Sequence, residues 1–317
     1  MWSNPRGLPG AERWSRMSWR GVHLSRSAHL AVDHRSLHIT FRDDLGGNFH
    51  LPLEDLSYLI IDAPDITLTS RLMAEMSSNG IMVVGVDQRH TPCWTSLPTG
   101  SFHRYGETTH LQLSATQPTK KRIWQSIVIA KILMQAGCLL RCGKDGSEAM
   151  QILAQKVRSG DPDKVEARAA RIYWKYLFKD RVFIRHDDDL PNALLNYGYA
   201  ILRSCLARIL CAKGFIPQIG IWHRSQTNAF NLADDLLEPF RPLVDHRAIQ
   251  VLNNAPSNLD LSLDHRREMA LIMEDSVMVN GEKVGLLNSM ELFVDSVKRS
   301  LSAKSPSEIV FPGFVQL

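Results

Sequence analysis

The chain has 317 residues, of which 44% are hydrophobic and 22% are charged, a composition typical of a folded globular protein. These proportions exclude a disordered tail protein, a collagen-like repeat and a coiled coil. The 37 Lys and Arg residues exceed the 33 Asp and Glu residues by only four, so the net charge alone does not indicate nucleic acid as a partner.

Residues 1–16 are set apart from the rest of the chain. They contain Pro5, Gly7, Pro9 and Gly10 and show no hydrophobic periodicity, so we expect a disordered extension. The first twenty residues lack the apolar segment of a secretory signal, and no apolar run approaches the roughly 20 residues that cross a bilayer. We therefore expect a cytoplasmic protein without a membrane partner.

Residues 17–87 alternate short β-prone runs with turns, which predicts a small β-rich domain. Two runs flank a four-residue turn at 33–36 and predict a hairpin. A helical spacing over 66–79, stopped by Gly80, interrupts the strands. The predicted strands are 28–32, 37–41, 49–53, 56–61 and 81–86.

The segment 88–118 is rich in Pro, Thr, Gly and His and is predicted to be a linker. Beyond it, residues 119–317 are predicted to form a larger helical domain, with a small hairpin at Asn280-Gly281. The fold class is therefore α+β. The predicted helices are 120–136, 161–179, 191–213, 228–237 and 287–301.

The first candidate for chemistry is Glu166. On the helix predicted over 161–179 it shares a face with Ala169, Ala170 and Tyr173, which places a carboxylate on an otherwise apolar face. A structural role is the alternative, because Asp163 and Glu166 have the spacing of a capping box.

The second candidate group surrounds His223, which follows Gly-Ile-Trp in a predicted turn. Asp235 and Glu238 come twelve and fifteen residues later, three apart on one predicted helix, so both can project to the same side. Asp234 could compete with Asp235 for that place. The alternatives are an ordinary histidine and a solvated acidic helix face.

One histidine with two or three carboxylates and no thiolate is a ligand set that suits Mg²⁺ or Mn²⁺ better than zinc. Such an ion stabilises negative charge at a phosphoryl group, which points to phosphodiester chemistry. A zinc hydrolase would need another strong ligand, and the nearest histidine, His246, lies beyond two prolines.

Basic residues lie close to both candidate groups in the sequence. They are interpreted either as solvated helix faces or as a track that binds a polyanion such as DNA. The candidate DNA-binding residues are Arg168, Arg171, Lys175, Arg224 and Arg241.

Four motifs follow one another between positions 165 and 245. They are VEARAARIYW (165–174), LNYGYA (195–200), GIWH (220–223) and DLLEPFRPLVD (235–245). In this order and spacing they resemble a known family, the CRISPR-associated endonuclease and integrase of the spacer-acquisition module, from about Met17 to the C-terminus. The uninterrupted EPFRPLVD run resembles the type II branch. One departure is Ala167, where relatives usually carry Gly.

The resemblance implies an N-terminal β-sandwich-like domain, used for dimerisation, and an all-helical catalytic domain in a prokaryotic protein. It places the metal site on Glu166, His223 and Glu238, with Asp235 as a further candidate ligand. The implied partners are a second copy of the chain, a small ferredoxin-like adaptation subunit that completes a heterohexamer, and double-stranded or branched DNA. The type II effector nuclease is a further candidate partner.

The implied reaction is the insertion of short foreign DNA into a repeat array. A 3′-hydroxyl attacks a phosphodiester at the leader–repeat junction, and a second end then attacks the far side of the repeat. Each step is a transesterification that needs no ATP, in which Mg²⁺ or Mn²⁺ activates the hydroxyl and stabilises the leaving oxygen. Water in place of the hydroxyl gives nuclease activity.

Two other functions are compatible with the residues. One is a DNA-binding scaffold that has lost catalysis, and the other is a stand-alone metal-dependent nuclease for branched repair DNA. For the integrase, Glu238→Ala or His223→Ala is expected to abolish joining and to leave dimerisation and DNA binding largely intact.

Overall fold

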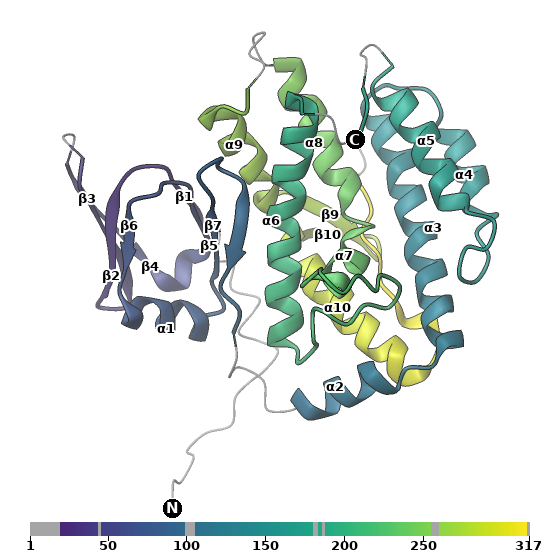
Figure 1. Ribbon diagram of the computed structural model, residues 1–317, viewed down its shortest axis with the longest axis horizontal. Coiled ribbons are helices and arrows are strands. Elements are labelled where there is room, and N and C mark those ends of the chain that lie inside the picture. The colour runs from purple at the N-terminus through teal and green to yellow at the C-terminus, as the bar shows by residue number, and fades with distance from the viewer. Residues whose placement is uncertain are drawn as a thin grey trace, which may run out of the picture. The chain divides into compact units, whose positions relative to one another are not determined.

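The computed structural model describes residues 20–43, 46–98, 105–179, 183–185, 188–254 and 260–315. The chain divides into two compact units between Val83 and Val84. Strands dominate the first unit and helices the second, which confirms the predicted α+β class (Figure 1). The extension predicted at residues 1–16 lies outside the described residues.

The first unit is built from two sheets and one helix. One sheet has the strand order β4-β3-β2-β6, and the other has the order β1-β5-β7. Strand β8 (Pro92–Thr95) pairs with residues 84–86 at the end of β7, and both of these segments fall in the second unit. The remaining elements are β1 (Arg20–Leu24), β2 (Ala28–Asp33), β3 (Ser36–Phe41), β4 (Asn48–Pro52), the short 3-10 helix η1 (Leu53–Asp55), β5 (Leu56–Ile61), β6 (Ile66–Leu68), α1 (Ser70–Ser78) and β7 (Met82–Val86).

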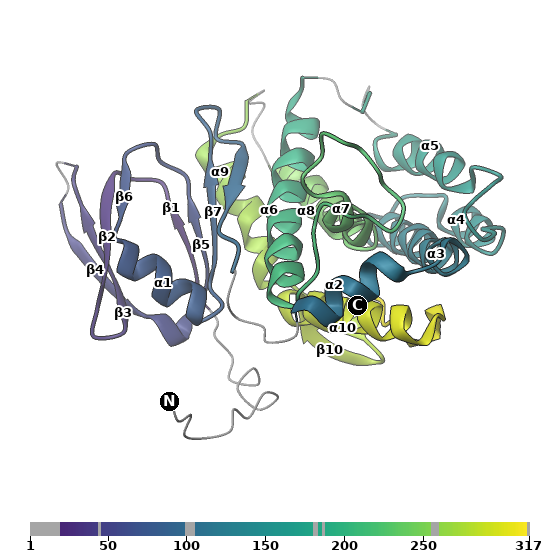
Figure 2. The same ribbon diagram turned by 60° about the horizontal axis from the view of Figure 1, so that its bottom comes forward.

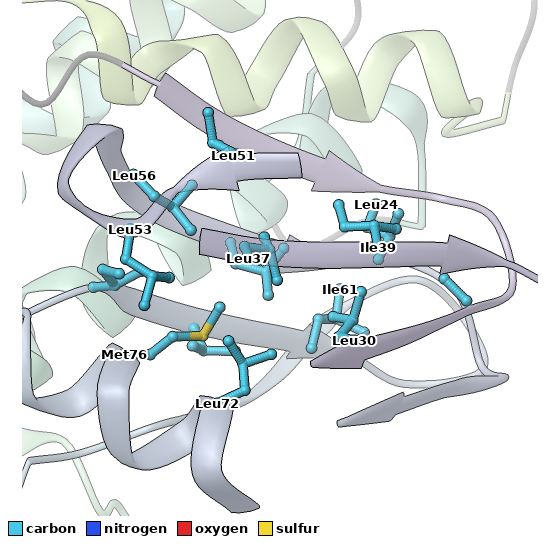
Figure 3. Packing of buried hydrophobic residues seen from close by; sticks show 14 residues of the cluster. Leu24, Leu30, Leu37, Ile39, Leu51, Leu53, Leu56, Ile61, Leu72 and Met76 are labelled. Carbon is cyan, nitrogen blue, oxygen red and sulfur yellow. The ribbon is translucent and has the colours of Figure 1, made fainter. Parts of the chain in front are cut away.

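A single apolar core joins these elements. Buried leucines and isoleucines of both sheets pack together with Leu72 and Met76 of α1 (Figure 3). Each fully buried side chain of this kind stabilises the folded state by about 1.5–3 kcal/mol relative to the same side chain exposed to water. The core between two sheets gives the unit its sandwich-like character.

The predicted hairpin is confirmed, and the predicted helix begins later than expected. Strands β2 and β3 pair antiparallel around His34 and Arg35, which both have positive φ, as a tight two-residue turn requires. The helix expected over 66–79 starts at Ser70, because residues 66–68 pair with β2 and the Thr69 side chain accepts the Leu72 N–H as an N-cap.

In the second unit, helix α6 packs against α7, α8, α9 and α10, whereas α3 packs against α4, α5, α7 and α8 (Figures 1 and 2). The sequence did not predict α4, α8 or α9. The elements are α2 (Tyr105–Ser114), α3 (Gln117–Arg141), α4 (Ser147–Ala154), α5 (Val165–Leu177), α6 (Leu190–Ala212), α7 (Asn231–Leu237), α8 (Arg241–Asn254), α9 (Leu263–Ala270), η2 (Leu271–Glu274), the hairpin β9 (Ser276–Val279) and β10 (Glu282–Gly285), α10 (Leu286–Ala303) and η3 (Pro306–Glu308).

The segment 88–118 is not a plain linker, because it contains β8 and α2. Two of its polar side chains, Thr109 and Gln112, make hydrogen bonds to residues about a hundred positions away in the chain. The buried Gln112 donates from Nε2 to the carbonyls of Ile216 (2.9 Å) and Ile219 (2.7 Å) and accepts the Ile216 N–H (2.9 Å). The polar composition of this segment led us to miss a packed helix. Helix α3 begins at Gln117, two residues before the predicted start of the helical domain.

Helix α3 is long and apolar enough to cross a membrane by length and composition alone. Its most apolar window has a mean hydropathy of 1.6, but 61% of that window is buried inside the protein. Burial of this extent is typical of the core helix of a globular domain.

Candidate active site

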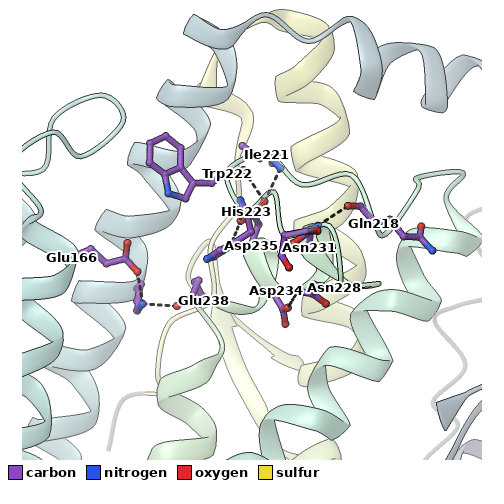
Figure 4. A network of polar contacts seen from close by, with 12 residues as sticks. Glu166, Gln218, Ile221, Trp222, His223, Asn228, Asn231, Asp234, Asp235 and Glu238 are labelled. Atoms are coloured by element: carbon purple, nitrogen blue, oxygen red, sulfur yellow. Dashed lines mark hydrogen bonds and ion pairs between the residues drawn. The ribbon is translucent and has the colours of Figure 1, made fainter. Parts of the chain in front are cut away.

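His223 lies on a loop between α6 and α7 and is held by Asp235 of α7 (Figure 4). The Asp235 Oδ2 accepts the backbone N–H groups of Ile221 (2.6 Å) and Trp222 (2.8 Å). Its Oδ1 accepts the His223 N–H (3.1 Å) and lies 2.6 Å from the His223 Nδ1. Gly220 permits this approach, because a side-chain carbon there would clash with Asp235 and the His223 carbonyl.

This arrangement changes the expectation for Asp235. Both of its oxygens already accept hydrogen bonds, and the carboxylate is fully buried, so the structure does not present Asp235 as a metal ligand. It instead fixes the ring through Nδ1 and leaves Nε2 of His223 for an incoming group. Asp234 faces elsewhere and accepts from the Asn228 side chain (2.7 Å).

The loop that carries His223 is also tied at other points. The Asn231 side chain donates to the carbonyls of Gln218 (3.0 Å) and Ser225 (2.8 Å). Gln112 of α2 holds Ile216 and Ile219. Side-chain amides thus replace the regular hydrogen bonds that this loop lacks.

Asp235→Asn is expected to lower the pKa of His223. The hydrogen bond from Asp235 raises that pKa against the opposing effect of burial, and an amide carries no charge to do so. The lost charge-assisted bonds should also reduce the free energy of unfolding by about 1–3 kcal/mol. An NMR titration of His223 in metal-free protein measures the first effect. Asp234→Asn, the matched control, should change the pKa less, and equal shifts in both variants would contradict the assignment.

Glu166 and Glu238 come from different helices and face one ammonium group. Glu166 lies in the first turn of α5, and Glu238 directly follows α7. The Lys131 Nζ on α3 lies 2.6 Å from Glu166 Oε1 and 2.6 Å from Glu238 Oε2. The Arg241 Nε donates to the other oxygen of Glu238 at 2.9 Å.

The surrounding charges keep Glu238 ionised although it is buried. Burial alone would raise the pKa of Glu238, but the Arg241 and Lys131 charges outweigh it and lower the pKa to about 2. Burial likewise opposes the charge of Lys131, while Glu238 and Glu166 raise the pKa of Lys131. Two cations and two carboxylates therefore form one compensated cluster.

The interpretation of Glu166 as part of a capping box is wrong. Asp161, not Asp163, caps the start of α5, because its carboxylate accepts the N–H groups of Val165 (2.8 Å) and Glu166 (3.0 Å). Asp163 pairs with Arg158. The Glu166 side chain is thereby available to face Lys131.

The carboxylate oxygens of Glu166 and Glu238 are suitable ligands for Mg²⁺ or Mn²⁺. In this structure the ammonium group of Lys131 lies between them. Among the residues that the structure describes, no three His, Cys, Asp or Glu side chains lie close enough to hold a metal ion. However, the buried Glu238 Oε2 has no hydrogen-bond partner, since Lys131 lies near it without hydrogen-bond geometry. Carboxylate oxygens that have no hydrogen-bond donor of their own are the ligands that hard cations prefer.

A buried hydrogen-bond network packs against Arg241 of this cluster. The guanidinium of Arg241 lies 4.6 Å from the centre of the Tyr199 ring. The hydroxyls of Tyr199 and Tyr173 (2.7 Å) donate to the two oxygens of Asp245 on α8. Gly198 lets α6 approach α8 here, because a side chain would clash with Val244.

Helix α3 contributes three side chains to this region from one face. Trp124, Lys131 and Cys138 are spaced seven residues apart and so lie on the same side of the helix. Trp124 contacts Trp222 and His223, Lys131 contacts the two glutamates, and the Cys138 thiol interacts with Tyr173.

Asp245→Asn is expected to remove a pH dependence of stability between pH 4 and pH 6. Burial raises the pKa of Asp245 from 3.8 to about 6, so in this range the folded state holds a proton that the unfolded state has lost. The contribution of Asp245 to stability therefore falls by about 3 kcal/mol as the pH rises through this range and does not change further above it. Urea unfolding at several pH values measures the slope, and an unchanged slope in Asp245→Asn would contradict the assignment.

The candidate DNA-binding residues separate into two groups. Arg168, Arg171 and Lys175 are exposed along one face of α5, and Arg224 is exposed and donates to Gln117 (2.8 Å). Arg241 does not join this surface, because its side chain is paired with Glu238 and packed on Tyr199.

Sequence reasoning missed several residues that build the site. Lys131 is a lone cation within a long apolar stretch of α3, and that anomaly was a usable signal. Gln112 and the capping role of Asp161 gave no comparable signal, because polar residues in turns and linkers are common.

The comparisons with known proteins agree with the fold and the motifs. The profile of the family described as CRISPR associated protein Cas1 matches residues 22–276. The CRISPR-associated endonuclease Cas1 of Neisseria meningitidis serogroup C is 32% identical over 302 residues, which cover 95% of this chain and 98% of the relative.

Two solved structures share the fold. A casposase bound to integration product superposes with a TM-score of 0.75 at 20% identity, over 90% of this chain and 91% of that chain. A chain of a Cas6-RT-Cas1–Cas2 complex gives a TM-score of 0.69 at 20% identity, over 92% of this chain and 36% of that chain. The family match and the extent of the Neisseria alignment identify the chain as a member of the Cas1 family of CRISPR-associated proteins.

Proposed function

We propose that this Cas1 protein is a metal-dependent DNA integrase that inserts short DNA segments into a CRISPR array by transesterification, with endonuclease activity as a side reaction. The observation that carries the proposal is the pair of carboxylates, Glu166 and Glu238, that two helices direct at one position. Both carboxylates lie 2.6 Å from the Lys131 ammonium. The negative charge of Glu238 also raises the pKa of His223. The casposase bound to integration product, which shares the fold, supports the same reaction class.

Each residue of the site has a distinct task in this proposal. Glu166, Glu238 and Nε2 of His223 would hold Mg²⁺ or Mn²⁺, which supplies a Lewis acid to the reacting phosphodiester. Asp235 fixes the imidazole, and Arg241 fixes the carboxylate of Glu238. The exposed Arg168, Arg171 and Lys175 would bind phosphates of the DNA on either side.

The assembly is part of the proposal. We expect a homodimer that uses the β-rich unit and joins a small Cas2-type subunit in a heterohexamer. The fold shared with a chain of a Cas6-RT-Cas1–Cas2 complex supports a Cas2 partner.

A strand-transfer assay tests the function. Purified protein, with and without a co-expressed small subunit, is incubated with a labelled branched DNA and Mn²⁺, and the products are separated by size. We expect Mn²⁺-dependent joining, and chelation of the metal should stop it. Cleavage without joining in the presence of the small subunit would indicate a stand-alone nuclease, and binding without either reaction would indicate a scaffold.

A further inference from the structure

We propose that the indole of Trp222 is a stacking platform for one unpaired nucleobase of the DNA strand that enters the active site. This proposal deepens the proposed function and rests on it. It assigns a binding subsite for single-stranded DNA beside the carboxylate cluster.

The two tryptophans at this point form a fixed stack. The ring centres of Trp124 and Trp222 lie 5.5 Å apart with their planes within 4° of each other. Trp124 is only 1% exposed, while Trp222 is 37% exposed. The outer indole is therefore supported by the buried one and still presents aromatic surface to solvent.

The exposed indole faces the same space as the candidate metal ligand. Trp222 and Trp124 line a cavity of about 340 Å³ together with Glu166 and with Ala167 and Ala170 of the same helix. Figure 4 shows the Trp222 ring and the Glu166 carboxylate in one region. A planar group stacked on Trp222 would thus place its attached phosphate near the reacting centre.

His223 links the stack to the site. The ring of Trp124 meets the His223 ring edge-on, with centres 5.6 Å apart. Trp222 also precedes His223 directly in the chain. The Asp235 carboxylate accepts the backbone N–H of Trp222 and also contacts the Nδ1 of His223. The platform and the imidazole are therefore positioned by the same carboxylate.

The lining of the cavity is expected to accept any of the four nucleobases. Its alanines leave room for a flat ring. The carboxylate of Asp161 already accepts two backbone N–H groups at the start of α5, which holds it in place. Lys164, also in the lining, supplies positive charge for a phosphate. Stacking on an aromatic ring tolerates every base, but it requires a base with an open face, as in single-stranded DNA.

The test is binding of DNA with a single-stranded 3′ end, in which one abasic nucleotide is moved stepwise along that end. For the wild type, one position should weaken binding by roughly 5- to 150-fold, the equivalent of one lost base–aromatic stack. Trp222→Phe should keep this response. Trp222→Leu should bind the intact DNA more weakly and show no further loss at that position.

The design separates stacking from folding and from the function itself. Leucine still covers Trp124, and Trp94→Leu removes another exposed tryptophan, which is not part of this cavity, so this variant should respond to abasic sites as the wild type does. The same abasic response in Trp222→Leu as in the wild type would overturn the proposal. A wild-type protein that neither joins nor cleaves DNA would contradict the proposed function instead.

Discussion

Glu238→Gln is expected to reduce metal-dependent DNA joining by more than roughly 100-fold. Loss of a residue that only supports a metal ligand costs roughly 10- to 100-fold, and Glu238 is itself a proposed ligand. The amide keeps the shape of the side chain, and its carbonyl can still accept from Arg241, but it removes a charge that a divalent ion needs. DNA binding and the folded state should be retained. Gel-based strand transfer with Mn²⁺ measures the activity, and Glu148→Gln, an exposed glutamate on α4, is the control.

The structure favours Gln over Ala for this test. Glu238 is buried and contacts both Lys131 and Arg241. Truncation to Ala leaves these partly buried cations without this acceptor and opens a cavity, whereas Gln keeps the volume and one acceptor oxygen. Loss of one partner of a buried pair costs about 3–5 kcal/mol. The expectation that Glu238→Ala leaves the protein otherwise intact is therefore revised, and full joining activity in Glu238→Gln would contradict the assigned site.

Lys131→Met is expected to make the stability of the protein depend on a divalent ion. The ammonium of Lys131 is the cation between Glu166 and Glu238, and its side chain is only 13% exposed. Its loss leaves two carboxylates facing each other, which should lower the free energy of unfolding of metal-free protein by about 3–5 kcal/mol. Mn²⁺ bound to the folded state alone should restore part of that stability.

Urea unfolding with and without MnCl₂ measures this effect. Stabilisation by Mn²⁺ should be larger in Lys131→Met than in the wild type, in which the ammonium competes for the same oxygens. Lys121→Met is the matched control, because it removes the same charge from an exposed position on the same helix. The same Mn²⁺ effect in all three proteins would rule out Lys131 as the internal competitor.

Local sequence patterns predicted those parts of the fold that local chemistry determines. The turn at His34 and Arg35 and the hairpin at Asn280-Gly281 were predicted because their backbone requirements are written in adjacent residues. Helix α8 was missed because Pro239 and Pro242 suggested a break, although proline is compatible with the first turn of a helix.

The site was only partly predictable for a different reason. Glu166, His223 and Glu238 stand out by residue type and spacing, and the four motifs link them to the Cas1 family. Their detailed surroundings depend on contacts across the chain, such as Lys131 with Glu166 or Gln112 with Ile216. No window of the sequence contains both members of such a pair, so their roles emerge only in the folded chain.

The single face of α3 that carries Trp124, Lys131 and Cys138 has a consequence for how this protein can change in evolution. Each of the three contacts a different part of the active-site region, and their two-turn spacing keeps them aligned. Substitutions elsewhere on the helix leave that alignment intact. One inserted or deleted residue between them would rotate the contacts apart by about 100°, so length, more than composition, is what this helix must preserve.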